Sequence, residues 1–258
     1  MREEIEKMDF LYLDWYNQYG IYFKLLEDNG VTSRIWVRLF MTTLLIGVIT
    51  TAIVGFIINW NEYVHYFTDF RIINILSALF WFILWGLLYS VISQMGYFAY
   101  LTVHRFGLGI FKSVSLWNGV QVVLILFVLF DLVYLRYETF ANSRDSVMPY
   151  IGLAVLLFIP ALVTAWFKAK QTNREAFIPA LFFMIVVTVI EWFPVLRVNE
   201  HSWVYLMLFP LLACNAYQLL ILHKLNLKSQ QERQRIESNK TTNKRGNASK
   251  KASKKPSI

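Results

Sequence analysis

The stretch "IINILSALFWFILWGLLYSVISQMGYFA", residues 72–99, decides the fold, because none of its side chains is acidic or basic. An α-helix needs about 20 mainly apolar residues to cross roughly 30 Å of hydrocarbon. A helix that is apolar on every side has no favourable place in water for its outer face. The stretch therefore predicts a helix that spans a membrane.

Five further runs of similar length and composition occur in the chain. They are Ile35–Ile58, Leu116–Leu135, Tyr150–Phe167, Phe177–Leu196 and Ser202–Leu222. Backbone groups in lipid must be hydrogen-bonded within their own segment, which favours helices. The alternation typical of membrane barrel strands is absent. The six runs predict an all-α membrane protein, a bundle of six transmembrane helices.

The composition supports this prediction. Hydrophobic residues make up 57% of the 258 residues, charged residues only 16%, and the mean hydropathy is +0.44. A soluble chain with a charged coat is less apolar. The single cysteine, Cys214, excludes an intrachain disulfide and is interpreted as a packing residue of the last run.

Basic residues in the short loops predict the orientation. One side of the membrane collects Arg34, Arg38, Arg105, Lys112, Lys168, Lys170, Arg174 and Lys224. On the other side Arg71, Arg136, Arg144 and Arg197 are mixed with acidic residues. Because basic loops stay in the cytoplasm, we expect a multi-pass protein of the cell membrane with both termini cytoplasmic.

Three segments follow from the charge distribution: residues 1–33, 34–223 and 224–258. The first is acidic and aromatic, and the three-and-four spacing from Ile5 to Leu26 indicates one amphipathic helix. Such a helix would lie on the membrane or pack on a partner. The last segment has eleven basic residues against Glu232 and Glu237, which predicts a largely disordered tail. It either fixes the topology or contacts anionic lipid. Nucleic-acid binding is not expected, since no folded module accompanies the charge.

Two acidic residues, Asp131 and Glu191, interrupt the apolar runs near Arg136 and Arg197. A charged side chain at bilayer depth costs about 2.5–3.5 kcal/mol. One interpretation is a proton or cation site open to the exterior. The other is that each acid reaches the interface and pairs with the nearby arginine. Pro194 follows Glu191 and can bend its helix.

Polar side chains without charge form a second set, which we expect nearer the cytoplasm. They are Ser90, Ser93, Gln94, Asn118, Gln121, Asn215 and Gln218. The last four form two pairs with a spacing of three, so each pair shares a helix face. Amides in lipid commonly hydrogen-bond between helices, at about 0.6 kcal/mol per contact. A polar cavity for a small ligand is the alternative.

Small residues recur every four positions in the first run, at Thr43, Gly47, Thr51 and Gly55. Such a stripe lets another backbone approach closely. It predicts a helix-packing face, used either as a seam inside the bundle or as a docking face for a partner.

Catalytic and metal-binding motifs are absent from the sequence. The histidines His65, His104, His201 and His223 lie at the ends of runs without ligand spacing, so neither a metal nor a cofactor is expected. The "GLG" at residues 107–109 is too short to bind phosphate and is interpreted as a flexible turn. The sequence thus predicts a protein that is not an enzyme.

Three stretches resemble the KbaA family, the KinB-signalling pathway activation proteins of spore-forming bacteria. They are "TSRIWVRLFMTTLLIG" from residue 32, "YFTDFRIINILSALFWFILWGLLYSVISQMGYFAYLTVHRFGLG" from residue 66, and "EWFPVLRVNEH" from residue 191. The resemblance continues to about Leu225, and the acidic leader Met1–Gly30 departs from it. It implies an integral membrane protein that a membrane sensor histidine kinase needs to feed the phosphorelay of sporulation. It supplies no active-site residues.

Two hypotheses of function follow. In the first, faces that include Gly47, Gly55 and the amides contact the transmembrane helices of the kinase and favour its active state, because a partner shifts an equilibrium by its differential affinity. In the second, the protein is a small transporter or ligand-sensing permease whose outward polar site is formed around Glu191 and Asp131.

Overall fold

The computed structural model describes residues 31–141 and 146–221 together with Lys224. The chain divides into two compact units, one formed by Phe40–His223 and the other by Met1–Leu39 with Lys224–Ile258. The predictions for the acidic leader and the basic tail lie outside the described residues, apart from Lys224, which is helical and exposed.

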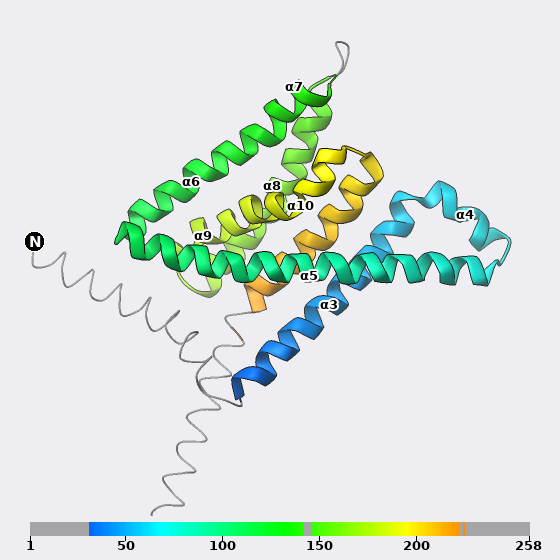
Figure 1. The fold of residues 1–258 in the computed structure, drawn as a ribbon, viewed down its shortest axis with the longest axis horizontal. Coiled ribbons are helices and arrows are strands. Elements are labelled where there is room, and N and C mark those ends of the chain that lie inside the picture. The colour runs from blue at the N-terminus through cyan, green and yellow to red at the C-terminus, as the bar shows by residue number, and fades with distance from the viewer. Residues whose placement is uncertain (1–30, 142–145, 222–223, 225–258) are drawn as a thin grey trace, which may run out of the picture. The chain divides into compact units, whose positions relative to one another are not determined.

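The described residues contain helices and no strand (Figure 1). The first half of the chain forms α3 (Val31–Ile58), the short α4 (Trp60–Thr68) and the 40-residue α5 (Ile72–Phe111). The third span begins as α6 (Val114–Phe130), passes through the π-helical turn η2 (Asp131–Leu135) and ends as α7 (Arg136–Phe140).

The second half contains three further long helical segments. The fourth span is α8 (Met148–Gln171). The fifth begins with the 3-10 turn η3 (Arg174–Ala176), continues through α9 (Phe177–Phe182) and the π-helical turn η4 (Phe183–Val187), and ends as α10 (Thr188–Val198). The last helix covers His201–Ile221 and is drawn in orange in Figure 1.

The prediction of six apolar helices is confirmed, since six described helices are long and apolar enough to cross a membrane. Most predicted ends lie within a few residues of the observed ones. The exception is α5, which continues twelve residues beyond Ala99 to Phe111. The predicted turn at Gly107–Gly109 is wrong, because these residues lie within α5. Gly107 is needed there for packing, since a Cβ at this position would lie 2.5 Å from the Trp117 ring.

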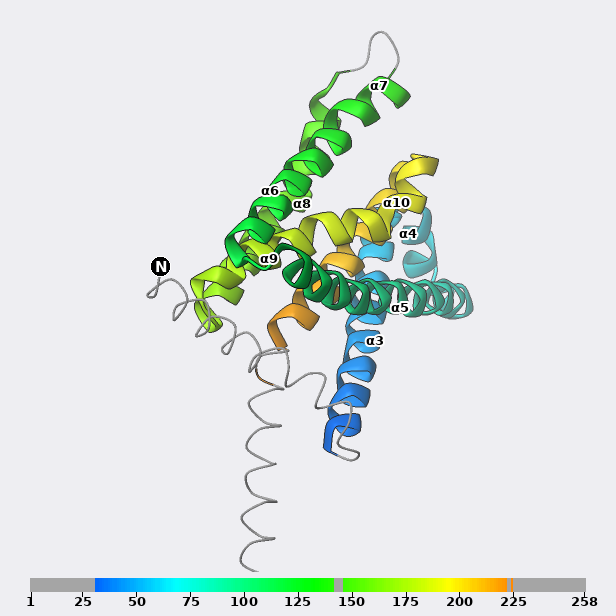
Figure 2. The same cartoon turned by 60° about the vertical axis from the view of Figure 1, so that its left-hand side comes forward.

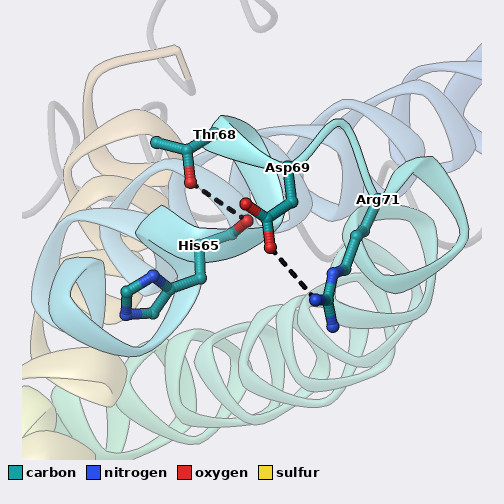
Figure 3. A network of polar contacts seen from close by, with 4 residues as sticks. All are labelled: His65, Thr68, Asp69 and Arg71. Carbon is teal, nitrogen blue, oxygen red and sulfur yellow. Dashed lines mark hydrogen bonds and ion pairs between the residues drawn. The ribbon is translucent and has the colours of Figure 1, made fainter.

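The connection between α3 and α5 contains the short helix α4, which none of the six predicted runs includes. Its aromatic residues pack on the ends of the neighbouring helices, with Tyr63 5.5 Å from Phe56 and 5.7 Å from Phe82 between ring centroids. A polar turn ends α4, where the Thr68 hydroxyl donates to the His65 carbonyl at 3.2 Å and Asp69 pairs with Arg71 at 3.1 Å (Figure 3).

The fifth and last spans form the centre of the Phe40–His223 unit. In the most apolar 18-residue stretch of the fifth span 67% of the residues are buried, and in that of the last helix 61% are. In each of the other four spans the buried share is 33% or less. Residues 179–189 of the fifth span are buried all the way round. This segment contacts α5, α6 and α8, and the view in Figure 2 shows α9 and α10 between these helices. The other four spans therefore present most of their side chains outward.

Candidate functional site: a polar centre between three helices

A buried cluster of polar side chains, here called the polar centre, joins α5, α10 and the last helix. Its members are Ser93, Thr188, Glu191, Asn215 and Gln218, all at most 7% exposed. Thr188 and Glu191 are three residues apart on α10, and so are Asn215 and Gln218 on the last helix. Each pair therefore occupies one face of its helix and points at the same neighbours.

Hydrogen bonds connect the side chains of the polar centre in a series that runs from donor to acceptor. The Gln218 side-chain amide donates to the Ser93 hydroxyl at 2.6 Å, and this hydroxyl donates to Asn215 Oδ1 at 2.6 Å. Asn215 Nδ2 then donates to both Thr188 Oγ1 at 2.9 Å and Glu191 Oε2 at 2.8 Å. Glu191 is thus the final acceptor of a chain that begins at Gln218.

The π-helical turn η4 sets the direction of the α10 residues. One extra residue in a helical turn rotates all that follows by about 100°. Phe183, inside η4, packs on Tyr97 and Tyr100 with centroids 5.5 and 4.9 Å away. Thr188, the first residue after η4, points into the polar centre. The turn therefore lets both segments of the fifth span face α5.

The structure corrects the expectation that Glu191 reaches the interface to pair with Arg197. Glu191 is buried and bonded to Asn215, and Arg197 is exposed on the same helix. It also corrects the separation of Glu191 from the amides, since Asn215 binds it directly.

Asp131 lies elsewhere in the described part of the bundle, with different neighbours from those of Glu191. It begins η2, which packs against α6, α7 and α8, and it is half-buried. Arg136, its expected partner, donates from Nη2 to Asn199 Oδ1 and stacks on the Tyr150 ring at 5.8 Å. Among the described residues, therefore, nothing joins Asp131 and Glu191 in one site.

The amides of α6 form a second cluster with α5. The Trp117 indole Nε1 donates to His104 Nδ1 at 3.0 Å, so this nitrogen is an acceptor and the Gln121 amide at 3.2 Å donates to it as well. Asn118, on the same face as Gln121, is half-buried, and its Oδ1 has no hydrogen-bond partner within the described residues. Gln94 is buried too, and its Nε2 has no partner in that part of the chain.

The stripe of Thr43, Gly47, Thr51 and Gly55 is buried inside the bundle. A Cβ on Gly47 would lie 1.8 Å from Ser90 Oγ and 3.1 Å from the Cys214 sulfur. A Cβ on Gly86 of α5 would lie 2.6 Å from the Val48 Cα. The two backbones therefore meet at Gly47 and Gly86. Because this face is occupied within the chain, the expectation that Gly47 and Gly55 contact a kinase is corrected.

Three features of the site escaped the sequence analysis. Thr188 and Gly96 were not singled out, since threonine and glycine are common in membrane helices. Lys168 was assigned only to a basic loop, but it is 7% exposed and donates to the Leu219 carbonyl at 3.0 Å. The sequence does not distinguish a buried lysine from an exposed one here, because the apolar run ends at Phe167 whether Lys168 is buried or exposed.

The chemistry of the polar centre is that of hydrogen bonding between helices. Among the described residues no three His, Cys, Asp or Glu side chains lie close enough to hold a metal ion. The cluster joins three helices through one donor chain, and a change at Glu191 or Asn215 alters contacts on all three.

Comparison with known proteins places this arrangement in a family. The family model described as "KinB-signalling pathway activation in sporulation", KbaA, matches residues 47–225. The chain belongs to the KbaA family. The KinB-signaling pathway activation protein of Bacillus subtilis (strain 168) is 52% identical to it over 196 residues, which are 76% of this chain and 99% of that protein. No solved structure matches the chain. The polar centre lies wholly inside the part that the KbaA family model covers.

Proposed function

We propose that this chain is a multi-pass membrane accessory protein that activates a KinB-type sensor histidine kinase and thereby feeds the phosphorelay of sporulation, without catalysing a reaction itself. The observation that carries the proposal is the 52% identity to the KinB-signaling pathway activation protein of B. subtilis along almost the whole length of that protein. The six apolar helices suit a partner that is itself embedded in the membrane.

The proposed mechanism is a preference for one conformation of the kinase. A partner without catalytic groups shifts an equilibrium only by binding one state better than the other. The contacts have to come from outward side chains, since the glycine stripe is buried. On α3 the outward face includes Met41, Leu45, Ile49 and Ile53, each at least 53% exposed. We propose that this face, opposite the glycine stripe, is among the contacts with the kinase's helices.

Complementation tests the function. Expression of this chain in a B. subtilis strain that lacks its own relative should restore KinB-dependent phosphorylation of the phosphorelay and sporulation. An inactive result with normal membrane levels of the chain would contradict the proposal. The kinase's phosphorylation in isolated membranes, with and without the chain, separates a direct effect from a change in gene expression.

Photo-crosslinking tests the contact. A crosslinking amino acid at Leu45 or Ile49 should capture the kinase, whereas one at Thr51 should capture only residues of the same chain, because Thr51 is buried. Capture at neither outward position, in membranes where the kinase is stimulated, would remove α3 from the proposed interface.

The second candidate is a small transporter or ligand-sensing permease. The buried carboxyl of Glu191 favours it, since ionisable groups inside membrane helices commonly mark transport paths. Glu191→Gln would then abolish transport or sensing and leave kinase association intact. In the leading proposal the same variant keeps kinase stimulation, because glutamine retains the oxygen that accepts from Asn215.

The topology and the ends of the chain belong to the same proposal. We propose that both termini lie in the cytoplasm, because the loops on one side of the membrane are basic, and that the tail after Lys224 contacts anionic lipid.

A further inference from the structure

The Glu191 carboxyl has two oxygens with different surroundings. Oε2 accepts the hydrogen bond from Asn215. Oε1 is buried and has no hydrogen-bond partner among the described residues. The side chain as a whole is 7% exposed. A buried polar atom without a partner costs free energy, and a buried charge without one costs far more.

The cationic side chains nearest to Glu191 along these helices are exposed or are hydrogen-bonded to other residues. Two described helices pack against α10, namely α5 and the last helix. Besides Glu191, these three helices carry the following titratable or charged side chains: Tyr89, Tyr97, Tyr100, His104 and Arg105 on α5, Arg197 on α10, and His201, Tyr205, Cys214 and Tyr217 on the last helix. Arg197 and His201 are exposed, and His104 Nδ1 accepts from Trp117. In the described part of the chain Glu191 forms no ion pair.

Space beside Oε1 is filled by the backbone of α5. A Cβ on Gly96 would lie 1.8 Å from Oε1 and 2.7 Å from the carboxyl carbon Cδ. The carboxyl thus lies against the bare Cα of a glycine. Among the described residues, no group of three His, Cys, Asp or Glu side chains could hold a metal ion beside it. With neither an ion pair nor a metal-binding cluster at Glu191 among the described residues, its surroundings favour neutralisation by a proton.

We propose that Glu191 is a proton-binding site at the centre of the bundle, with the proton on Oε1 and the Asn215 amide bonded to the carbonyl oxygen Oε2. The neutral carboxyl then packs on Gly96 without a buried charge. Release of the proton leaves a carboxylate between α10 and α5 that no cation of the described residues balances. The bound proton therefore holds the two helices together.

Infrared difference spectroscopy of the full-length protein in lipid vesicles tests the proposal. The spectrum of the wild type minus Glu191→Gln should show the C=O stretch of a protonated carboxyl at neutral pH, with a downshift in D₂O. Asp131→Asn is the matched control and should leave that band unchanged. Identical spectra of wild type and Glu191→Gln in the carboxylic-acid region would overturn the proposal.

A pair of glycine variants on α5 tests the packing. Gly96→Ala should shift or remove the Glu191 band, whereas Gly109→Ala should not, because nothing lies within 4 Å of a Cβ at Gly109. Equal spectra of the two variants would contradict the contact. Because glutamine has the shape of the neutral acid, failure of Glu191→Gln to fold would also contradict the proposal. The measurement needs no kinase, so it is independent of the proposed function.

Discussion

Asn215 carries more of the buried hydrogen bonding than any other single side chain of the polar centre. It accepts from Ser93 and donates to Thr188 and Glu191, so one amide joins three helices. Buried polar groups that lose their partners cost about 1–3 kcal/mol each. The residue therefore combines a small volume with a large effect on stability.

Replacement of Asn215 by leucine tests this role. Asn215→Leu keeps the branched shape of the side chain and leaves Ser93, Thr188 and Glu191 without their partner, so we expect a loss of at least about 2 kcal/mol of stability. Thermal unfolding in detergent measures it as a lower Tm. Asn118→Leu is the control and should change the Tm little, since Asn118 Oδ1 has no partner in the described residues. An equal decrease in both variants would contradict the role of Asn215.

Lys168 gives a prediction of the opposite kind. Its ammonium group is buried and bonded to the Leu219 carbonyl. A buried charge without an opposite charge costs free energy, and an apolar side chain of similar length removes that cost. Lys168→Met should therefore leave the Tm unchanged or raise it. A large decrease would show that the bond to Leu219 contributes more than the burial of the charge costs.

Residue types indicate which side chains are polar and lie within the apolar runs, but not which partners these side chains have. The spacing of Asn215 and Gln218 placed them on one face, and the structure supplies Ser93 and Glu191 as their neighbours. Glu191 was placed at the interface because an arginine follows it six residues later. Its burial depends on how α10 rotates after η4, and a π-helical turn has no signal in this sequence.

At the scale of elements, α3 and α5 cross at a glycine of each helix, so no side chain separates the two backbones. Gly47 and Gly86 allow the two backbones to touch, and the Ser90 hydroxyl lies where a Cβ of Gly47 would be. The small residues of the stripe were recognised in the sequence. Whether they faced α5 or a partner protein required the structure, since close packing looks the same from one helix alone.

Replacement of Gly47 by leucine tests whether this residue is needed for packing inside the bundle or only for docking of a partner. Gly47→Leu should prevent the approach of α3 to α5 and abolish the monodisperse peak in fluorescence-detected size-exclusion chromatography. Gly152→Leu on α8 is the control and should preserve the peak, because nothing lies within 4 Å of a Cβ there. A normal peak for Gly47→Leu would contradict the internal seam.

Charged residues mark some helix ends but not others, since Arg105, which the sequence assigns to a basic loop, lies inside α5. The loop after Leu196 was found because Arg197 and Glu200 follow. The sequence does not predict the continuation of α5 to Phe111, since each of Gly107 and Gly109 weakens a helix by about 1 kcal/mol relative to alanine. Packing on Trp117 compensates for the glycine at residue 107. Tertiary contacts thus decided the length of this helix.

For the molecule as a whole, the number of spans follows from composition, whereas the orientation rests on the basic loops alone. Single cysteines test it. A membrane-impermeant maleimide should label Ser146→Cys in intact cells and should not label Ser257→Cys until the cells are opened. The native Cys214 is fully buried and contributes little background. The reverse pattern would place both termini outside the cell.

The length of α5 has a consequence for how the surrounding lipid affects the interior of the bundle. The 40 residues of α5 make a rod of about 60 Å, twice the thickness of the hydrocarbon layer. Such a rod has to lean or to emerge from the bilayer, and its angle changes with the thickness of the surrounding lipid. Gly86 and Gly96 lie on this rod, so we expect lipids of different chain length to affect both the crossing with α3 and the Glu191 contact.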